Sequence, residues 1–118
     1  KVTGVQTCAL PTSRDPATDT IPGGPTRTPG GASLPYDIEA QTRAVIANVR
    51  TVLEAAGATL DHVLDVTVFL THMDRDFPTF NRVYAELLGH VGATRTTLGV
   101  TALPTPIAIE LKVIARAP

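Results

Sequence analysis

The last quarter of the chain carries the pattern that most restricts its fold. Within residues 107–115, four aliphatic residues recur at every second position: Ile107, Ile109, Leu111 and Val113. Side chains of a β-strand point alternately to its two faces, so these four predict one apolar face of a strand. The run 95–101 before it, separated by a Pro-containing turn, predicts a further strand.

Glu110 lies in the middle of the last strand, on the face that also carries Ala108, Lys112 and Ile114. A carboxylate in so apolar a strand is costly to bury unless it is paired or takes part in chemistry. Glu110 is therefore the first candidate for a functional residue.

Composition limits the classes of protein to consider. The chain has 118 residues, 43% of them hydrophobic and 18% charged, which is typical of a single globular domain. A net charge of −1 without clusters of Lys or Arg argues against nucleic acid or an anionic membrane as partner. No apolar run approaches the roughly 20 residues that span a bilayer. The single cysteine, Cys8, excludes an internal disulfide, and no secretory signal pattern is present, so we expect a cytoplasmic protein.

The first residues do not match the rest. Residues 1–11 (KVTGVQTCALP) have neither helical nor strand periodicity and resemble a translated sequencing-adapter remnant, although a genuine N-terminal strand is the alternative. We interpret 1–11 as non-native and 12–118 as a truncated domain. Residues 12–36, dense in Pro and Gly, predict a long loop.

The remaining periodicities predict an α+β fold. We expect a helix over 37–56, a strand over 64–71 with Leu64 and Val66 on its apolar face, and a turn over 72–75. A second helix should begin at Asp76 as its N-cap, with Pro78 in the first turn, and end at 89–92.

These elements predict two helices on one face of a mixed β-sheet. Strands 64–71 and 95–101 should be parallel through a right-handed crossover, and strands 95–101 and 106–115 should pair as an antiparallel hairpin. Phe69, Ala108 and Ile114 should lie on the face away from the helices, where oligomerisation is the simplest cover.

Five segments in order resemble the RidA (YjgF) family: 37–49 (DIEAQTRAVIANV), 66–70 (VTVFL), 80–84 (FNRVY), 94–97 (TRTT) and 109–110 (IE). The first and fourth look most like the 2-aminomuconate deaminase branch. The resemblance covers roughly residues 12–118. It implies a chorismate-mutase-like fold and a homotrimer with active sites in the clefts between subunits. Its chemistry would be hydrolysis of enamines or imines to a carbonyl compound and ammonia, without metal or organic cofactor. The family's N-terminal strands, which contribute a tyrosine, are missing or replaced here.

The resemblance also implies roles for two charged residues. Arg95 matches the arginine that binds the substrate carboxylate, a task suited to a planar, permanently charged guanidinium. The structural alternative is a surface salt bridge. Glu110 matches the acid that positions water, and a raised pKa would let it donate and accept protons in turn. The alternative for Glu110 is an ion pair with Lys112 or Arg95.

Two further residues match the family's pocket. Thr97 lies two positions after Arg95, on the same strand face, and can offer its hydroxyl or backbone N–H, although threonine is also a common β-former. Asn81 matches an asparagine near the cleft, and a solvated helix surface is its alternative. Tyr84 is expected to be core. The run 72–76 contains His and Asp but no metal-site spacing, so no metal is expected.

The sequence thus predicts a cofactor-free deaminase of a small enamine or imine acid, most plausibly 2-aminomuconate. The alternative is a non-catalytic, trimeric, small-acid-binding or chaperone-like protein. RNA cleavage is disfavoured by the balanced charge and by the lack of an aromatic stacking platform.

Overall fold

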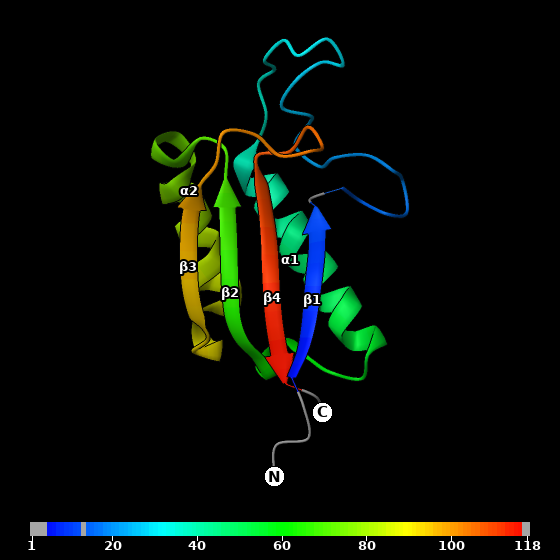
Figure 1. The fold of residues 1–118 in the computed structure, drawn as a ribbon, viewed down its shortest axis with the longest axis vertical. Coiled ribbons are helices and arrows are strands. Elements are labelled where there is room, and N and C mark those ends of the chain that lie inside the picture. Colours follow the sequence, from blue (N-terminus) through cyan, green and yellow to red (C-terminus); the bar gives the residue numbers. More distant parts are fainter. Residues whose placement is uncertain (1–4, 13, 117–118) are drawn as a thin grey trace.

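One four-stranded sheet carries both long helices on the same face (Figure 1). The computed structural model describes residues 5–12 and 14–116, and for 5–12 it describes the backbone alone. In chain order the elements are β1 (Val5–Thr12), α1 (Ile38–Ala55), β2 (Val63–Leu70), α2 (Met73–Leu88), β3 (Thr94–Gly99) and β4 (Ile109–Arg116). Short 3-10 turns, Leu60–His62 and Gly89–Val91, precede β2 and follow α2. The expected α+β class, with two helices on one face, is confirmed.

Helix α1 forms where the apolar periodicity predicts it. The Asp37 side chain caps it by accepting hydrogen bonds from the backbone N–H groups of Glu39 (2.9 Å) and Ala40 (3.2 Å). The residues that α1 buries follow three- and four-residue steps: Val45, Ile46, Val49 and Leu53. Gly57, with φ of 80°, turns the chain just beyond the helix.

Helix α2 begins one turn earlier than expected. Asp76 is not its N-cap, because His72 occupies that position. The backbone N–H of Asp76 already donates to the backbone carbonyl of His72 at 2.9 Å, as in a helix. Pro78 consequently lies in the second turn of the helix and not in the first. The Asp76 side chain is buried and accepts a hydrogen bond from the Tyr36 hydroxyl. Residues 72–75, expected as a turn, are therefore mostly helix.

The sheet order is β1-β4-β2-β3. Strands β2 and β3 are parallel, as expected, and with α2 behind the sheet in Figure 1 the crossover is right-handed. The predicted hairpin of β3 and β4 is wrong, because β2 lies between them. Segment 100–108 crosses the end of β2: the Val100 N–H donates to the Leu70 carbonyl (2.9 Å) and the Thr71 N–H to the Ala108 carbonyl (3.1 Å).

A strand forms in the region where no strand periodicity was recognised. The β1 backbone pairs antiparallel with β4, from Val5 opposite Arg116 to Thr12 opposite Glu110. The register shifts between Ala9 and Thr12, where Pro11 lacks a backbone donor, and such a shift breaks a period-two pattern. Residues 1–4 of the segment interpreted as non-native lie outside the described residues, and the origin of 1–11 stays a prediction.

The core lies between the sheet and the helices. From β2 it takes Val66, Val68 and Leu70, and from β4 it takes Ile109, Leu111 and Val113. Leu64 was expected among them but is 43% exposed, because the β2–β4 register shifts between Val63 and Asp65. Val63 is buried in its place.

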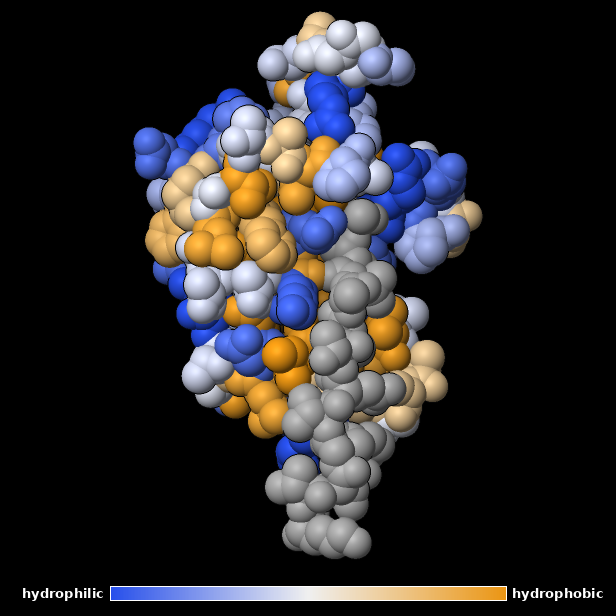
Figure 2. Space-filling model, viewed as in Figure 1, coloured by the Kyte–Doolittle hydropathy of each residue, from blue (hydrophilic) through white to orange (hydrophobic). Residues whose placement is uncertain are grey.

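The other face of the sheet is turned toward the viewer in Figures 1 and 2. In Figure 2, apolar and polar side chains are mixed on it. Phe69 and Ile114 lie on it half-buried. Ala108 does not, because it precedes β4 and is fully buried. Cover of this face by a second copy stays a prediction.

The Pro- and Gly-rich segment is a loop, as expected. Residues 14–36 extend beyond the end of the sheet (Figure 1) and contain two isolated bridges, between Asp15 and Thr20 and between Arg27 and Ser33. The loop is held at the start of α1, where the Asp37 N–H donates to the Gly23 carbonyl at 2.9 Å.

Candidate functional site

Arg95 lies on the helix-covered face of β3. It stands beside Val66 of β2 in the parallel register, and Val66 is a core residue. Its guanidinium carbon lies 4.7 Å from the centre of the Tyr84 ring, 5.4 Å from that of Phe80 and 5.8 Å from that of Phe77. Aromatic faces at this range attract a cation and hold the guanidinium in place without neutralising it. In the part of the chain that the structure describes, Arg95 forms no ion pair within 4 Å, which leaves its charge available to an anion.

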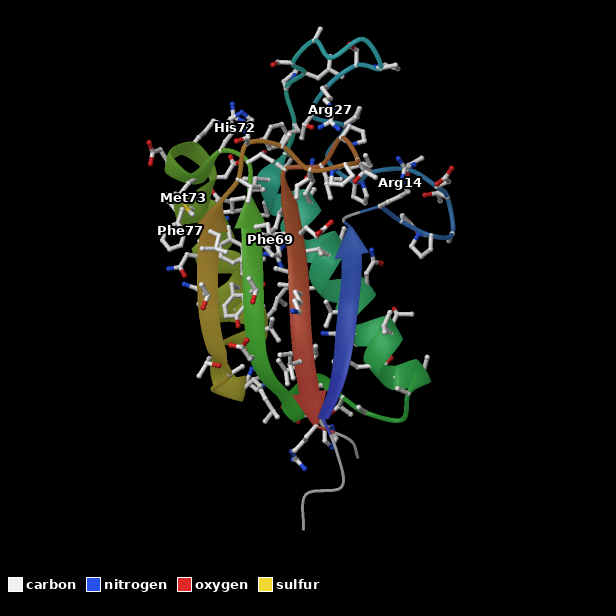
Figure 3. All side chains as sticks on the ribbon, viewed as in Figure 1. Arg14, Arg27, Phe69, His72, Met73 and Phe77 are labelled. Atoms are coloured by element: carbon white, nitrogen blue, oxygen red, sulfur yellow. The ribbon has the colours of Figure 1, made fainter. Side chains whose placement is uncertain are left out.

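The Arg95 side chain lines a groove between β3 and the start of α2. The groove has a volume of about 560 Å³ and is lined by Met73, Asp74, Phe77, Pro78, Arg95 and Thr97. Figure 3 shows Met73 and Phe77 together beside β3 at this end of α2. A cation at the base of a mainly apolar groove suits a small organic acid.

Of the two further residues that match the family's pocket, Thr97 lines this groove and Asn81 does not. Thr97 stands beside Val68 in the register, on the same face as Arg95, and lines the groove. Its hydroxyl is buried without a hydrogen-bond partner among the described residues, so it retains donor capacity. Asn81 is exposed on α2 and does not line the groove. It lies one turn beyond Phe77 and Pro78 along α2, and its expected place near the cleft stays a prediction.

Glu110 lies in β4 on the sheet face opposite to the helices. It stands beside Phe69, half-buried, while its neighbours Ile109 and Leu111 point into the core. Burial raises the pKa of the Glu110 carboxyl above its ordinary value. Within the described residues no ion pair joins it to Lys112 or Arg95, so neither of the structural alternatives considered for Glu110 is present.

One chain therefore does not bring the two charged residues together. Arg95 faces α2 and Glu110 faces the opposite side of the sheet, with β2 between their strands. They were expected on neighbouring strands, which requires the hairpin that does not form.

The sequence reading missed most of the groove. Met73 and Asp74 were assigned to a turn, and Phe77 was not singled out as a candidate site residue. The spacing of Met73, Phe77 and Phe80 would have placed all three on one face of a helix that begins one turn earlier.

Beside the groove, Tyr36, His72, Arg75 and Asp76 form a polar cluster. The Tyr36 hydroxyl donates to the Asp76 carboxylate and accepts from the Arg75 guanidinium, and it lies 3.2 Å from His72 Nδ1. Burial and the Asp76 hydrogen bond raise the pKa of Tyr36 to about 12. The cluster joins the end of the loop to the first turn of α2. In the described ranges, no group of three acidic, His or Cys side chains is arranged to hold a metal ion.

Fold and groove together define a small α+β protein with an arginine packed against aromatic rings in a groove at the sheet edge. Residues 23–117 match the family model described as endoribonuclease L-PSP. A RutC family protein of Pyrococcus horikoshii is 44% identical over 85 residues, covering 72% of this chain and 67% of that protein. TdcF of Escherichia coli, whose name designates it a candidate reactive intermediate deaminase, is 32% identical over 74% of this chain and 69% of its own.

A solved structure of similar fold is that of YyfA from Yersinia pestis, described as a member of the conserved Rid protein family of unknown function. Its TM-score is 0.76 with 30% identity, covering 98% of this chain and 82% of that one. This chain belongs to the L-PSP family, the RidA (YjgF) family that its motifs resemble. The matched part spans about two thirds of the length of the curated relatives. Among the described residues, no helix is both long and apolar enough to cross a membrane.

Proposed function

We propose that this protein is a hydrolytic deaminase of small enamine or imine acids. The observation that carries the proposal is Arg95, a guanidinium without a carboxylate partner in the described structure, held over aromatic rings at the base of a mainly apolar groove. Such a group binds a carboxylate through two parallel hydrogen bonds. The name of the relative TdcF supports the reaction class.

The reaction needs only water and proton transfer. An enamine first tautomerises to the imine. Water then adds to the C=N carbon, giving a carbinolamine, whose C–N bond breaks to release ammonia and leave the oxo acid. Glu110 would accept a proton from the attacking water and pass it to the nitrogen, which gives the carbinolamine. It would then carry the hydroxyl proton to the same nitrogen as the C–N bond breaks and the carbonyl forms. A pKa raised by burial brings its protonated and ionised forms closer in abundance near neutral pH, which suits this double role.

The proposed active site requires two copies of the chain. Because Arg95 and Glu110 face opposite sides of the sheet, they can share a cleft only when the uncovered face of one copy lies against the groove of another. Half-buried Phe69 and Ile114 on that face support an interface there. We propose a homotrimer with one site at each of its interfaces.

For the particular substrate we propose 2-aminomuconate. The support is the likeness of residues 37–49 and 94–97 to that branch of the family. One of its carboxylates would bind Arg95. The other would need a cation from the second copy, since Arg95 is the one cationic side chain among the described residues that line the groove.

The test is ammonia release by the purified chain from enamine acids generated in solution, with 2-aminomuconate among them. Arg95→Ala should raise KM more than it lowers kcat, while leaving the mass of the assembly unchanged. Glu110→Gln should lower kcat by about 100-fold or more, since it removes the proton carrier. Near-normal turnover of Glu110→Gln would refute the assigned role.

Matched controls are available on α1. Glu54 and Arg50 are exposed there, and Glu54→Gln and Arg50→Ala should leave both constants unchanged. The non-catalytic alternative, a trimer that only binds small acids, predicts Arg95-dependent binding of the acid without ammonia release by the wild type.

A further inference from the structure

Gln41 is a fully buried polar side chain with a defined task in the fold. It lies in α1 with 0% exposure, and both ends of its amide are hydrogen-bonded. Its Oε1 accepts the backbone N–H of Ala108 at 2.9 Å, and its Nε2 donates to the carbonyl of Gly24 at 3.0 Å. An N–H needs an oxygen acceptor and a carbonyl needs an N–H donor, so these partners fix the orientation of the amide.

The Ala108 contact places Gln41 next to the candidate site. Ala108 directly precedes β4, and Glu110 is two residues further along the chain. Ala108 also accepts the Thr71 N–H at 3.1 Å, so its position is set by β2 on one side and by Gln41 on the other. The entry of β4 into the sheet, and with it the backbone that carries Glu110, is thus held by a side chain from α1.

The Gly24 contact adds the long loop to the same arrangement. Near Gly24, the Thr26 N–H donates to the Pro106 carbonyl at 3.0 Å. The Arg27 guanidinium donates to the carbonyls of Leu103 (2.9 Å) and Pro104 (3.2 Å). Arg27 is labelled in Figure 3 where the loop meets the connection into β4. Gln41 therefore joins three segments: α1, the loop and the start of β4.

We propose that Gln41 is a positioning residue for Glu110, which fixes the start of β4 and the adjoining loop so that the carboxyl group is held in its reactive place. The inference rests on the proposed function. Displacement of a catalytic group by about 1 Å costs on the order of 100-fold in rate, so a buried side chain that contacts no substrate can have a large effect on turnover.

The test compares Gln41→Met with the wild type in the full chain. Methionine fills the space but provides neither hydrogen bond. We expect kcat for ammonia release to fall about 10- to 100-fold, because a displaced Glu110 carboxyl leaves its reactive geometry. KM should change less than about twofold, because Arg95 binds the carboxylate elsewhere. Gln41→Glu keeps an acceptor for Ala108 and loses the donor to Gly24, so it should give an intermediate kcat and remain informative if Gln41→Met does not fold.

Thr42→Val is the matched control. Thr42 is the next residue and is equally buried. Among the described residues its hydroxyl donates within its own helix, to the Ile38 carbonyl at 2.7 Å. Loss of this hydroxyl in Thr42→Val should lower the thermal stability of the protein but leave kcat unchanged. If Gln41→Met and Gln41→Glu keep the kcat of Thr42→Val, the proposal is overturned and Gln41 is a structural residue.

A second readout does not depend on activity. The Glu110 carboxyl can be titrated by 13C NMR, its signal being the one that Glu110→Gln removes. In Gln41→Met we expect the midpoint to fall toward that of an ordinary glutamate, as the loosened strand admits water; an unchanged midpoint would overturn the proposal. If the wild type releases no ammonia, the proposed function fails, while this titration still decides whether Gln41 holds Glu110 in place.

Discussion

Arg95 and Glu110 lie on opposite faces of one sheet, Arg95 toward α2 and Glu110 toward the uncovered side. Strand β2 separates their strands. A site that uses both residues must therefore combine the groove of one copy with the open face of another.

Subunit complementation follows from this geometry. At a substrate concentration well below the KM of Arg95→Ala, the variants Arg95→Ala and Glu110→Gln should each show little activity, yet mixed trimers co-expressed from both should regain about a third of wild-type activity. Each site takes Arg95 from one copy and Glu110 from the next, so in a trimer that holds both variants one of the three sites keeps both residues intact. Ammonia release by doubly tagged, purified assemblies measures this. Activity no greater than that of the single variants would mean that the two residues do not share a site.

Glu110 should make the protein less stable as pH rises. Burial raises its folded pKa, so between its ordinary value and the raised value the folded state binds more protons than the unfolded state. Stability is then lost as pH increases through that window, opposite to the behaviour of a paired carboxylate. Glu110→Gln should therefore raise Tm at pH 7 and give no gain below pH 4. Thermal melts across pH test this, and an equal gain at both ends would contradict it.

Removing the Tyr36 hydroxyl should destabilise the start of α2. Tyr36→Phe leaves the buried Asp76 carboxylate without that donor, and we expect a loss of about 1–2 kcal/mol in the free energy of unfolding. The wild type should also lose stability as pH rises from about 10 toward 12, since the folded pKa of Tyr36 is raised to about 12.

Urea unfolding of wild type and Tyr36→Phe measures both effects. The Phe variant should show a smaller alkaline loss than the wild type, and Tyr84, whose pKa is also raised by burial, accounts for part of the remainder. Tyr84→Phe is the control, because Tyr84 is buried but its hydroxyl has no hydrogen bond to another described residue. A loss as large in Tyr84→Phe would mean that the Tyr36 contacts contribute little.

Two glycines with similar backbone angles should respond differently to substitution. Gly23 has φ of 84°, and a Cβ there would lie 2.5 Å from the Asp37 carbonyl oxygen. Gly31 has φ of 92°, with no atom within 4 Å of such a Cβ. Gly31→Ala should cost about 1 kcal/mol from backbone strain alone, and Gly23→Ala clearly more, because the loop must move from α1. Chemical denaturation compares the two, and equal losses would show that the contact with Asp37 yields easily.

Local patterns were sufficient for much of the fold. The apolar period of α1, its Asp37 cap and the alternation in β4 each depend on neighbours within a few residues, and all were predictable. The start of α2 was not, because Asp76 has the chemistry of a cap but its carboxylate is bound by Tyr36 from a distant loop. The helix begins at Met73 instead, and this brings Met73 and Asp74 to the groove.

The order of the strands was also beyond local reading. Closeness in sequence favoured a hairpin of β3 and β4, whereas segment 100–108 instead crosses the end of β2 through hydrogen bonds at Leu70 and Thr71. The order of the strands decides which side chains lie next to each other in the sheet. Because β2 lies between β3 and β4, Arg95 and Glu110 are not neighbours.

The sequence by itself determined the family, helix α1, strands β2, β3 and β4 and the candidate residues at positions 95, 97 and 110, because motif and periodicity are local properties of the chain. Only the tertiary structure decided that Arg95 rests on three aromatic rings, that Glu110 faces the other side, and that Gln41 joins the loop to β4. These relations depend on strand order and on long-range hydrogen bonds, which no periodicity within a single segment encodes.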